Sequence, residues 1–206
     1  MRRAVCIFVI LFTAAISLAQ ASQPMEALRE PLEKGFRLLK DSMYKNPDKK
    51  DLQREKIWEI IREAFDFDAV AMRTLVRYDR KRFTLQQKKE FTDAFAEFLK
   101  SIYLDKLLGE FRDEEVDFLS QDMLTDSKAL VSTMVLSRNR EIPIDYSMWR
   151  RRDKWLIYDV KVEGVSLIKN YRIQFTKILS KESPADLIER LKNKTVEQKK
   201  RSAVTE

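Results

Sequence analysis

The spacing of apolar residues changes along this chain, and that change constrains its fold more than any other feature. Up to Gly109, large apolar residues recur every three or four positions, as on one face of a helix. Beyond it they alternate with polar residues, as in a strand, and helical spacing returns after Gly164. We therefore predict a single α+β domain over residues 22–193, with helices over 24–109, a sheet over 114–163 and returning helices over 166–193.

The helical part begins with predicted helices over 24–44 and 51–64, followed by a short helix through 70–75 that Asp68 is expected to cap. Thr84 and Gln87 then fit a capping box, which opens a helix that ends near Gly109. That helix carries a broad aromatic stripe over residues 91–107. The stripe predicts either a packed core or part of a ligand cavity, because periodicity alone cannot separate the two.

The sheet is predicted to be a curved antiparallel meander of about four strands, because only short connections, at 139–141 and 151–153, separate its alternating segments. Helices packed on its concave face could enclose an apolar cavity. A helix is expected from Ser166, and Ser183 followed by Pro184 indicates the start of a last, short helix. Residues 194–206 are polar and are expected to form a frayed tail.

The first 21 residues have the three parts of a secretory signal peptide: a basic start, an apolar run and an Ala-x-Ala end. The run from Ala4 to Leu18 is short for a membrane span, although an uncleaved anchor is the alternative. Cleavage near Ala21 would remove Cys6 and two arginines, lowering the formal net charge from +7 to +5. The sequence therefore predicts an exported protein without cysteine.

The residue inventory excludes several kinds of active site. The chain has no histidine and one cysteine, so Ser-His-Asp triads, HExxH zinc sites and cysteine-based zinc clusters are ruled out. Asp66 with Asp68 could be a general acid–base pair, and Ser166 with Lys169 a nucleophile and its base, but helix capping explains both better. We therefore expect a protein that is not an enzyme and has no catalytic residue, metal or cofactor.

Basic residues gather in runs at 77–82, 150–154 and 192–201. Such runs can form a solvated face, or they can attract anionic lipid headgroups or an acidic protein partner. The export signal argues against a nucleic-acid partner. The partner of these basic runs therefore stays open at this stage.

One segment after the last strand is more specific. Tyr158-Asp159-Val160 and the stretch from Glu163 to Phe175, EGVSLIKNYRIQF, resemble the signature of the toluene-tolerance family, the MlaC-type periplasmic phospholipid-binding proteins. The resemblance extends over about residues 26–193 and includes matches at 65–75, 84–103 and 142–146. Two departures are Val76, where the family often has glycine, and the basic turn at 151–153, where it also often has glycine.

The resemblance implies a periplasmic carrier of phospholipid. Such a carrier shuttles lipid between an outer-membrane lipoprotein–porin complex and an inner-membrane ABC transporter with an MCE-domain component, and we expect it to be a monomer. Alternation and helical spacing place the acyl chains between the sheet and the helices, although a one-residue slip would exchange the two sheet faces. The predicted lipid-binding residues are Phe95, Leu99, Tyr103, Met134, Ile144, Tyr146, Met148, Tyr158, Val160, Val165, Ile168, Tyr171 and Phe175.

Two other functions stay open on the sequence. One is a carrier of a different lipid, such as a hopanoid or a hydrophobic solvent-related ligand. The other is an exported interaction module without a ligand, in which the aromatic stripe is only core. Lipid identity, the number of acyl chains and the direction of transport are not encoded in any recognisable pattern.

Overall fold

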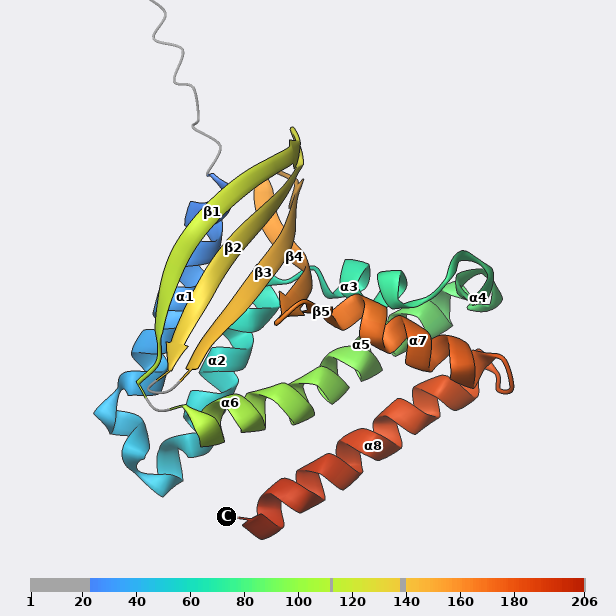
Figure 1. The fold of residues 1–206 in the computed structure, drawn as a ribbon. Coiled ribbons are helices and arrows are strands. Elements are labelled where there is room, and N and C mark those ends of the chain that lie inside the picture. Colours follow the sequence, from blue (N-terminus) through green and yellow to red (C-terminus); the bar gives the residue numbers. More distant parts are fainter. Residues whose placement is uncertain (1–22, 112, 138–139, 206) are drawn as a thin grey trace, which may run out of the picture.

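A computed structural model describes residues 23–111, 113–137 and 140–205 (Figure 1). The predicted signal peptide and its cleavage site lie outside the described residues. The helices are α1 (Pro24–Lys40), α2 (Lys50–Ala64), α3 (Phe67–Thr74), α4 (Arg77–Arg82), α5 (Leu85–Leu99), α6 (Asp105–Glu110), α7 (Leu167–Leu179) and α8 (Pro184–Thr205). The strands are β1 (Glu115–Thr125), β2 (Lys128–Ser137), β3 (Arg140–Arg151), β4 (Lys154–Val162) and β5 (Val165–Ser166).

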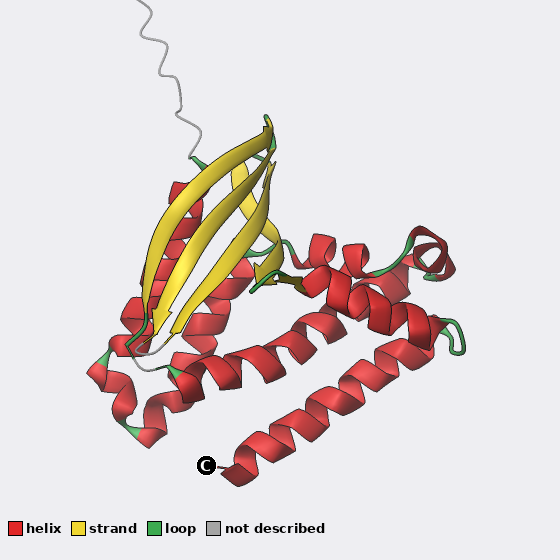
Figure 2. Cartoon of the chain, viewed as in Figure 1, coloured by secondary structure: helices red, strands yellow, loops and turns green. Residues whose placement is uncertain are grey.

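The strands form one antiparallel sheet in the order β1-β2-β3-β4-β5, curved and open at β1 (Figure 2). This confirms the α+β fold and the curved antiparallel sheet. The sequence missed β5 because it has only two residues, too few to show alternation. The connection predicted at 139–141 is only partly described, since residues 138–139 lie outside the described ranges.

The β3–β4 hairpin closes through the two-residue turn Arg152-Asp153. Both residues have positive φ, 48° and 63°, as a type I′ turn requires. Glycine or asparagine usually occupies such positions, because a Cβ is disfavoured there. The departure from glycine seen in the sequence therefore changes the side chains of the turn and leaves its hairpin geometry intact.

The helices pack in two groups. The sheet curves around α1, whose Leu28 is fully buried against it, and α2 lies beside α1 (Figure 1). A separate helical core forms where α3, α5, α7 and α8 pack together beyond β4, around Phe91 and Phe95. Within the described residues, no helix is long and apolar enough to cross a membrane.

The long helix after Thr84 begins as predicted. The Thr84 hydroxyl accepts a hydrogen bond from the Gln87 amide at 3.1 Å, and the Gln87 side chain accepts one from the Thr84 amide at 3.0 Å. The helix does not continue uniformly, because a π-helical turn, Lys100–Leu104, separates α5 from α6. Such turns arise where an extra residue is accommodated within a helix.

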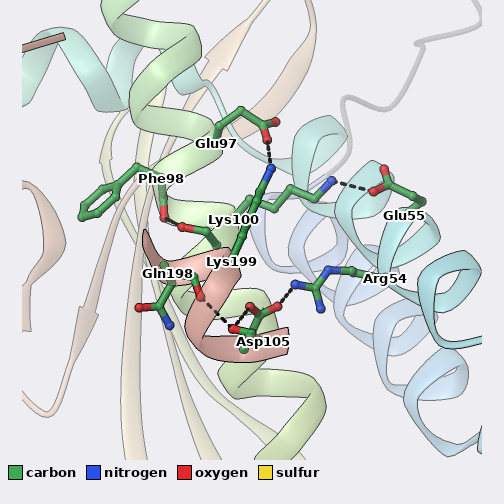
Figure 3. Close-up of polar contacts among 10 residues, drawn as sticks. Arg54, Glu55, Glu97, Phe98, Lys100, Asp105, Gln198 and Lys199 are labelled. Atoms are coloured by element: carbon green, nitrogen blue, oxygen red, sulfur yellow. Dashed lines mark hydrogen bonds and ion pairs between the residues drawn. The ribbon is translucent and has the colours of Figure 1, made fainter. Parts of the chain in front are cut away.

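The prediction of a frayed tail is wrong for residues 194–205, which continue α8 as helix. Thr195 is buried, and the Ser202 hydroxyl donates to the Asp105 carboxylate at 2.7 Å. Asp105 also accepts a hydrogen bond from Arg54, so one carboxylate joins α2, α6 and α8 (Figure 3). These tertiary contacts hold a segment whose own composition is too polar to predict a docked helix.

The prediction that Asp68 caps α3 is also wrong. The N-cap is Asp66, whose carboxylate accepts a hydrogen bond from the Ala69 amide at 2.9 Å, whereas Asp68 is exposed. The other oxygen of Asp66 accepts from the indole N–H of Trp149 at 3.1 Å and from Arg151 at 2.6 Å. Asp66 therefore fixes the start of α3 against strand β3.

Candidate functional site

The most extensive apolar surface that joins sheet and helix is the layer between the sheet and α1, called the inner layer below. One face of the sheet supplies almost all of it, and α1 closes it from the other side. Its buried members are Leu28, Ala129, Val131, Tyr146, Met148, Trp155 and Ile157.

Four of the predicted lining residues lie together on the inner face of the sheet. Ile144, Tyr146 and Met148 alternate along β3, and Tyr146 is directly opposite Val160 on β4. Tyr146 and Met148 are buried, whereas Ile144 and Val160 are partly buried against them. The structure therefore brings this part of the predicted lining onto one surface.

Met134 and Tyr158 do not belong to that surface. Met134 pairs with Pro143, one position away from the inner-face pair Thr133 and Ile144, so it lies on the opposite face. Tyr158 is the extra residue of a bulge in β4, which displaces it from the alternation of its neighbours.

Tyr158 packs instead on Trp149, with their ring centroids 5.5 Å apart. The Arg73 guanidinium lies 4.2 Å from the Tyr158 ring centroid and 4.9 Å from that of Trp149, within the range of cation–π attraction. Tyr158 therefore contributes to the contact between α3 and the outer face of the sheet.

The aromatic residues predicted on the helices form a different cluster. Phe95, Tyr171 and Phe175 pack edge to face in the helical core, with centroid distances of 5.0 Å for Phe95–Tyr171 and 5.3 Å for Phe95–Phe175, and Leu99 joins them. Phe65 packs against both this core and the inner layer. The expected single lining is thus divided into two apolar clusters that meet at one side chain.

The remaining predicted residues have varied surroundings. Ile168 is buried at the start of α7, where its amide donates to the Asp159 carboxylate at 3.1 Å. Tyr103 is 46% exposed and Val165 is 63% exposed, so neither is enclosed in either cluster. Burial and the neighbouring Tyr103 hydroxyl both raise the pKa of Tyr171.

Sequence reasoning missed the residues that enclose the inner layer most completely. Leu28, Ala129 and Val131 are fully buried, and Trp155 and Ile157 complete the inner face on β4. The two-residue hairpin turn fixes which residues of β3 and β4 are opposite one another, and this was the one available signal for Trp155. Nothing in the sequence indicated that α1 would be the helix covering the sheet.

The polar groups at the inner layer are paired and neutral. Burial raises the pKa of Tyr146 to about 12, and a hydrogen bond with the Thr133 hydroxyl opposes that rise. While the phenol is neutral, the Thr133 hydroxyl donates to the Ile144 carbonyl oxygen at 3.2 Å. With its phenol held neutral, the layer can hold apolar groups without a buried charge.

Ser166 has the role of a helix cap. Its hydroxyl accepts from the Lys169 amide at 3.1 Å and donates to the Asp159 carboxylate at 2.6 Å. The backbone of Lys169, and not its ammonium group, makes this contact. The geometry is that of a cap and gives no support to a Ser-Lys nucleophile.

A surface groove of about 610 Å³ leads to the edge of the inner layer. It lies between α1, α2 and the β3–β4 turn, and it shares Ala27, Ala64 and Trp155 with the inner layer. Its volume lies within the range of about 300–1,000 Å³ typical of small-molecule sites. Exposed Lys34 and Lys154 are among its lining residues. The other charged residues that line it are Arg29, Arg37, Glu26, Glu30, Glu33, Glu63 and Asp153.

The candidate site is thus an apolar layer between a curved antiparallel sheet and an amphipathic helix, with a groove at its edge, in an α+β protein. The family model described as MlaC protein matches residues 30–193, and the chain belongs to this family. The chain is also similar in fold to the solved structure of a phospholipid-binding protein from Ralstonia solanacearum in complex with a phospholipid.

That similarity has a TM-score of 0.75 at 18% sequence identity, and it covers 86% of this chain and 99% of the other. No curated protein matches the chain significantly.

Proposed function

We propose that this protein is a periplasmic carrier that holds the acyl chains of a phospholipid in the inner layer. The observation that carries the proposal is the continuous apolar inner face of the sheet, covered by α1, in a chain of the MlaC family. A protein of the same fold is known in complex with a phospholipid, which supports the choice of ligand.

The energetics fit passive carriage. Exposing an acyl chain of about 16 carbons to water costs more than about 10 kcal/mol of free energy, at about 0.8 kcal/mol per CH₂ group. A carrier must therefore supply an apolar surface of comparable free energy, so that transfer is nearly balanced and needs no covalent step. The headgroup can remain in water, so the site requires no reactive side chain.

Lipid entry requires the inner layer to open, because side chains fill it in this structure. Leu28 and Val131 have no exposed surface, and Met148 is 1% exposed. The contacts of α1 with β1 are few and partly polar: the Met25 amide donates to the Gln121 side chain at 2.7 Å, and Arg29 lies over the Phe118 ring at 4.0 Å. We infer that α1 moves away from the sheet and that acyl chains replace Leu28 against it.

The groove beside Trp155 is the proposed entrance. Lys34 and Lys154, which line it, have no carboxylate partner among the ion pairs of the described residues, so both ammonium groups are available to a headgroup phosphate. Acyl chains that pass the groove would reach Trp155 and Ala64 before the rest of the inner layer.

We further propose that the protein delivers its lipid between the two membranes. Its partners would be an outer-membrane lipoprotein–porin complex and an inner-membrane ABC transporter with an MCE-domain component. Membership of the MlaC family and the signal-like segment of residues 1–21 support this placement.

The test is native mass spectrometry with lipid extraction on the protein purified from residue 22 onward. Recovery of one or two phospholipids per chain is expected. Ile144→Trp on the inner face should lower that recovery, because the larger ring occupies the space of the acyl chains. Met134→Trp is the matched control, since it makes a comparable change on the opposite face of the sheet.

Other outcomes would change the conclusion. Recovery of a rigid polycyclic lipid would favour a hopanoid carrier over a phospholipid carrier. A ligand-free protein whose interior stays filled would favour an interaction module. Equal recovery from the Ile144 and Met134 variants, at unchanged thermal stability, would remove the inner layer as the lipid site.

A further inference from the structure

We propose that α4 and the first turn of α5 form a docking face for the surface of an anionic phospholipid bilayer. This docking face consists of Arg77, Tyr78, Lys81, Leu85, Lys88 and Lys89. It is separate from the inner layer, and the proposal does not depend on lipid carriage.

The docking face carries the two most exposed large apolar side chains of the described residues. Leu85 is 85% exposed and Tyr78 is 75% exposed. Each has cations on its own helix face: Tyr78 is three positions from Lys81, and Leu85 is three and four positions from Lys88 and Lys89. Exposed Arg77 precedes Tyr78 on α4 and adds a further cation nearby. Apolar side chains flanked by lysine and arginine are typical of helices that lie in the interfacial region of a membrane.

Tyr78 stays exposed because other residues of α4 hold the helix against the rest of the protein. Asp79 is 6% exposed and forms an ion pair with Arg82 at 3.3 Å. Arg82 also donates to the carbonyl oxygens of Leu179 at 2.6 Å and Glu182 at 2.9 Å, which join α4 to the turn between α7 and α8. Buried Phe83 and the capping box at Thr84 then fix the start of α5.

Charge complementarity identifies the partner. Arg77, Lys81, Lys88 and Lys89 have no ion pair with a carboxylate within the part of the chain that the structure describes. A cation near an anionic membrane contributes about a fivefold gain in affinity. The exposed leucine and tyrosine favour a bilayer over an acidic protein, because a fluid headgroup region accepts them without a preformed pocket.

The position of the docking face suits contact with a bilayer. Figure 1 shows α4 at the end of the helical layer remote from β1, with the C-terminal half of α8 directed away from it. This arrangement provides control residues on α8, called the control patch below: exposed Val196 and Lys200, four positions apart on one helix face, and exposed Lys194 on another face. The control patch has the same kinds of side chain at a distant site.

The test is co-sedimentation of the protein, from residue 22 onward, with vesicles of phosphatidylcholine alone or with about one-third phosphatidylglycerol. Binding is expected only with phosphatidylglycerol, and salt at about 0.5 M should weaken it by screening. Lys81→Glu with Lys89→Glu should weaken binding at least about 20-fold, because it reverses two cations. Leu85→Ser should weaken it about fivefold.

The control patch decides between a docking face and overall charge. Lys194→Glu with Lys200→Glu changes the net charge equally, and Val196→Ser removes an exposed apolar side chain; both should bind nearly as tightly as the unmodified protein. The proposal would be overturned if the docking-face and control double variants lost vesicle binding equally. It would also be overturned if the unmodified protein did not bind the vesicles. Binding to immobilised polyglutamate but not to the vesicles would overturn it in favour of an acidic protein partner.

Lipid extraction of the same variants separates this proposal from the proposed function. The docking-face variants should retain their bound phospholipid, because the inner layer is untouched. If the purified protein contains no lipid but still binds the vesicles, the docking face is supported and the proposed lipid carriage is contradicted.

Discussion

Asp66 joins the helical core to the sheet, and its replacement should therefore destabilise the whole fold. The carboxylate is buried and accepts hydrogen bonds from the Ala69 amide, the Trp149 indole and Arg151. Asp66→Ala removes the N-cap of α3, at about 1 kcal/mol, and leaves the indole N–H without its acceptor, at about 1–3 kcal/mol. The ion pair with Arg151 adds little, because that side chain is 53% exposed.

The expected loss is about 2–4 kcal/mol in the free energy of unfolding. Urea denaturation followed by tryptophan fluorescence measures it, because the midpoint shifts while the slope stays constant. Asp66→Asn separates the two contributions. Its amide oxygen can still cap α3, whereas its NH₂ group would face the two donors, so we expect about half the loss.

Asp68→Ala is the matched control, since Asp68 is exposed and two residues away. Its effect should stay within about 0.5 kcal/mol. The reasoning is refuted if Asp66→Ala and Asp68→Ala destabilise the protein equally, because Asp68 would then share the capping role. It is also refuted if Asp66→Ala costs no more than an exposed surface substitution.

Two further predictions concern the inner layer and α8. The pKa of Tyr146 rises from about 10 unfolded to about 12 folded, so its contribution to stability is present below pH 10 and is lost as the pH rises towards 12, amounting to about 2–3 kcal/mol. Tyr146→Phe should therefore lose less stability than the unmodified protein between pH 10 and 12 in urea titrations, and parallel curves would contradict this. Deletion of residues 194–206 should lower the free energy of unfolding by about 1–2 kcal/mol, because it removes buried Thr195 and the Ser202–Asp105 hydrogen bond. An unchanged urea midpoint would mean that this part of α8 contributes nothing, and Ser202→Ala isolates the hydrogen bond.

Local patterns were sufficient wherever the deciding interactions are local. The capping box at Thr84 and the cap at Ser166 each depend on residues three positions apart, so the sequence predicted them correctly. The antiparallel sheet followed from short connections such as 151–153. The sequence could not decide whether Asp66 or Asp68 caps α3. Asp66 is held as the cap by contacts with a strand more than 80 positions away.

The site was predictable only in part, for a reason that is visible in β2. Its apolar residues occupy both alternating sets, with Val131 on one face and Met134 on the other, so alternation could not identify the inner face. A bulge then displaced Tyr158 from the pattern of β4. Pairing between strands decides both positions, and a single segment contains no information about its partner.

The sequence alone determined the order and kind of most helices and long strands, the α+β class and the absence of histidine chemistry, because these depend on periodicity and composition. The tertiary structure decided which helix covers the sheet, how the aromatic residues divide between two clusters, and that residues 194–205 are held as helix. Each of these depends on contacts between segments far apart in the chain. The free energy of such contacts can outweigh local preference.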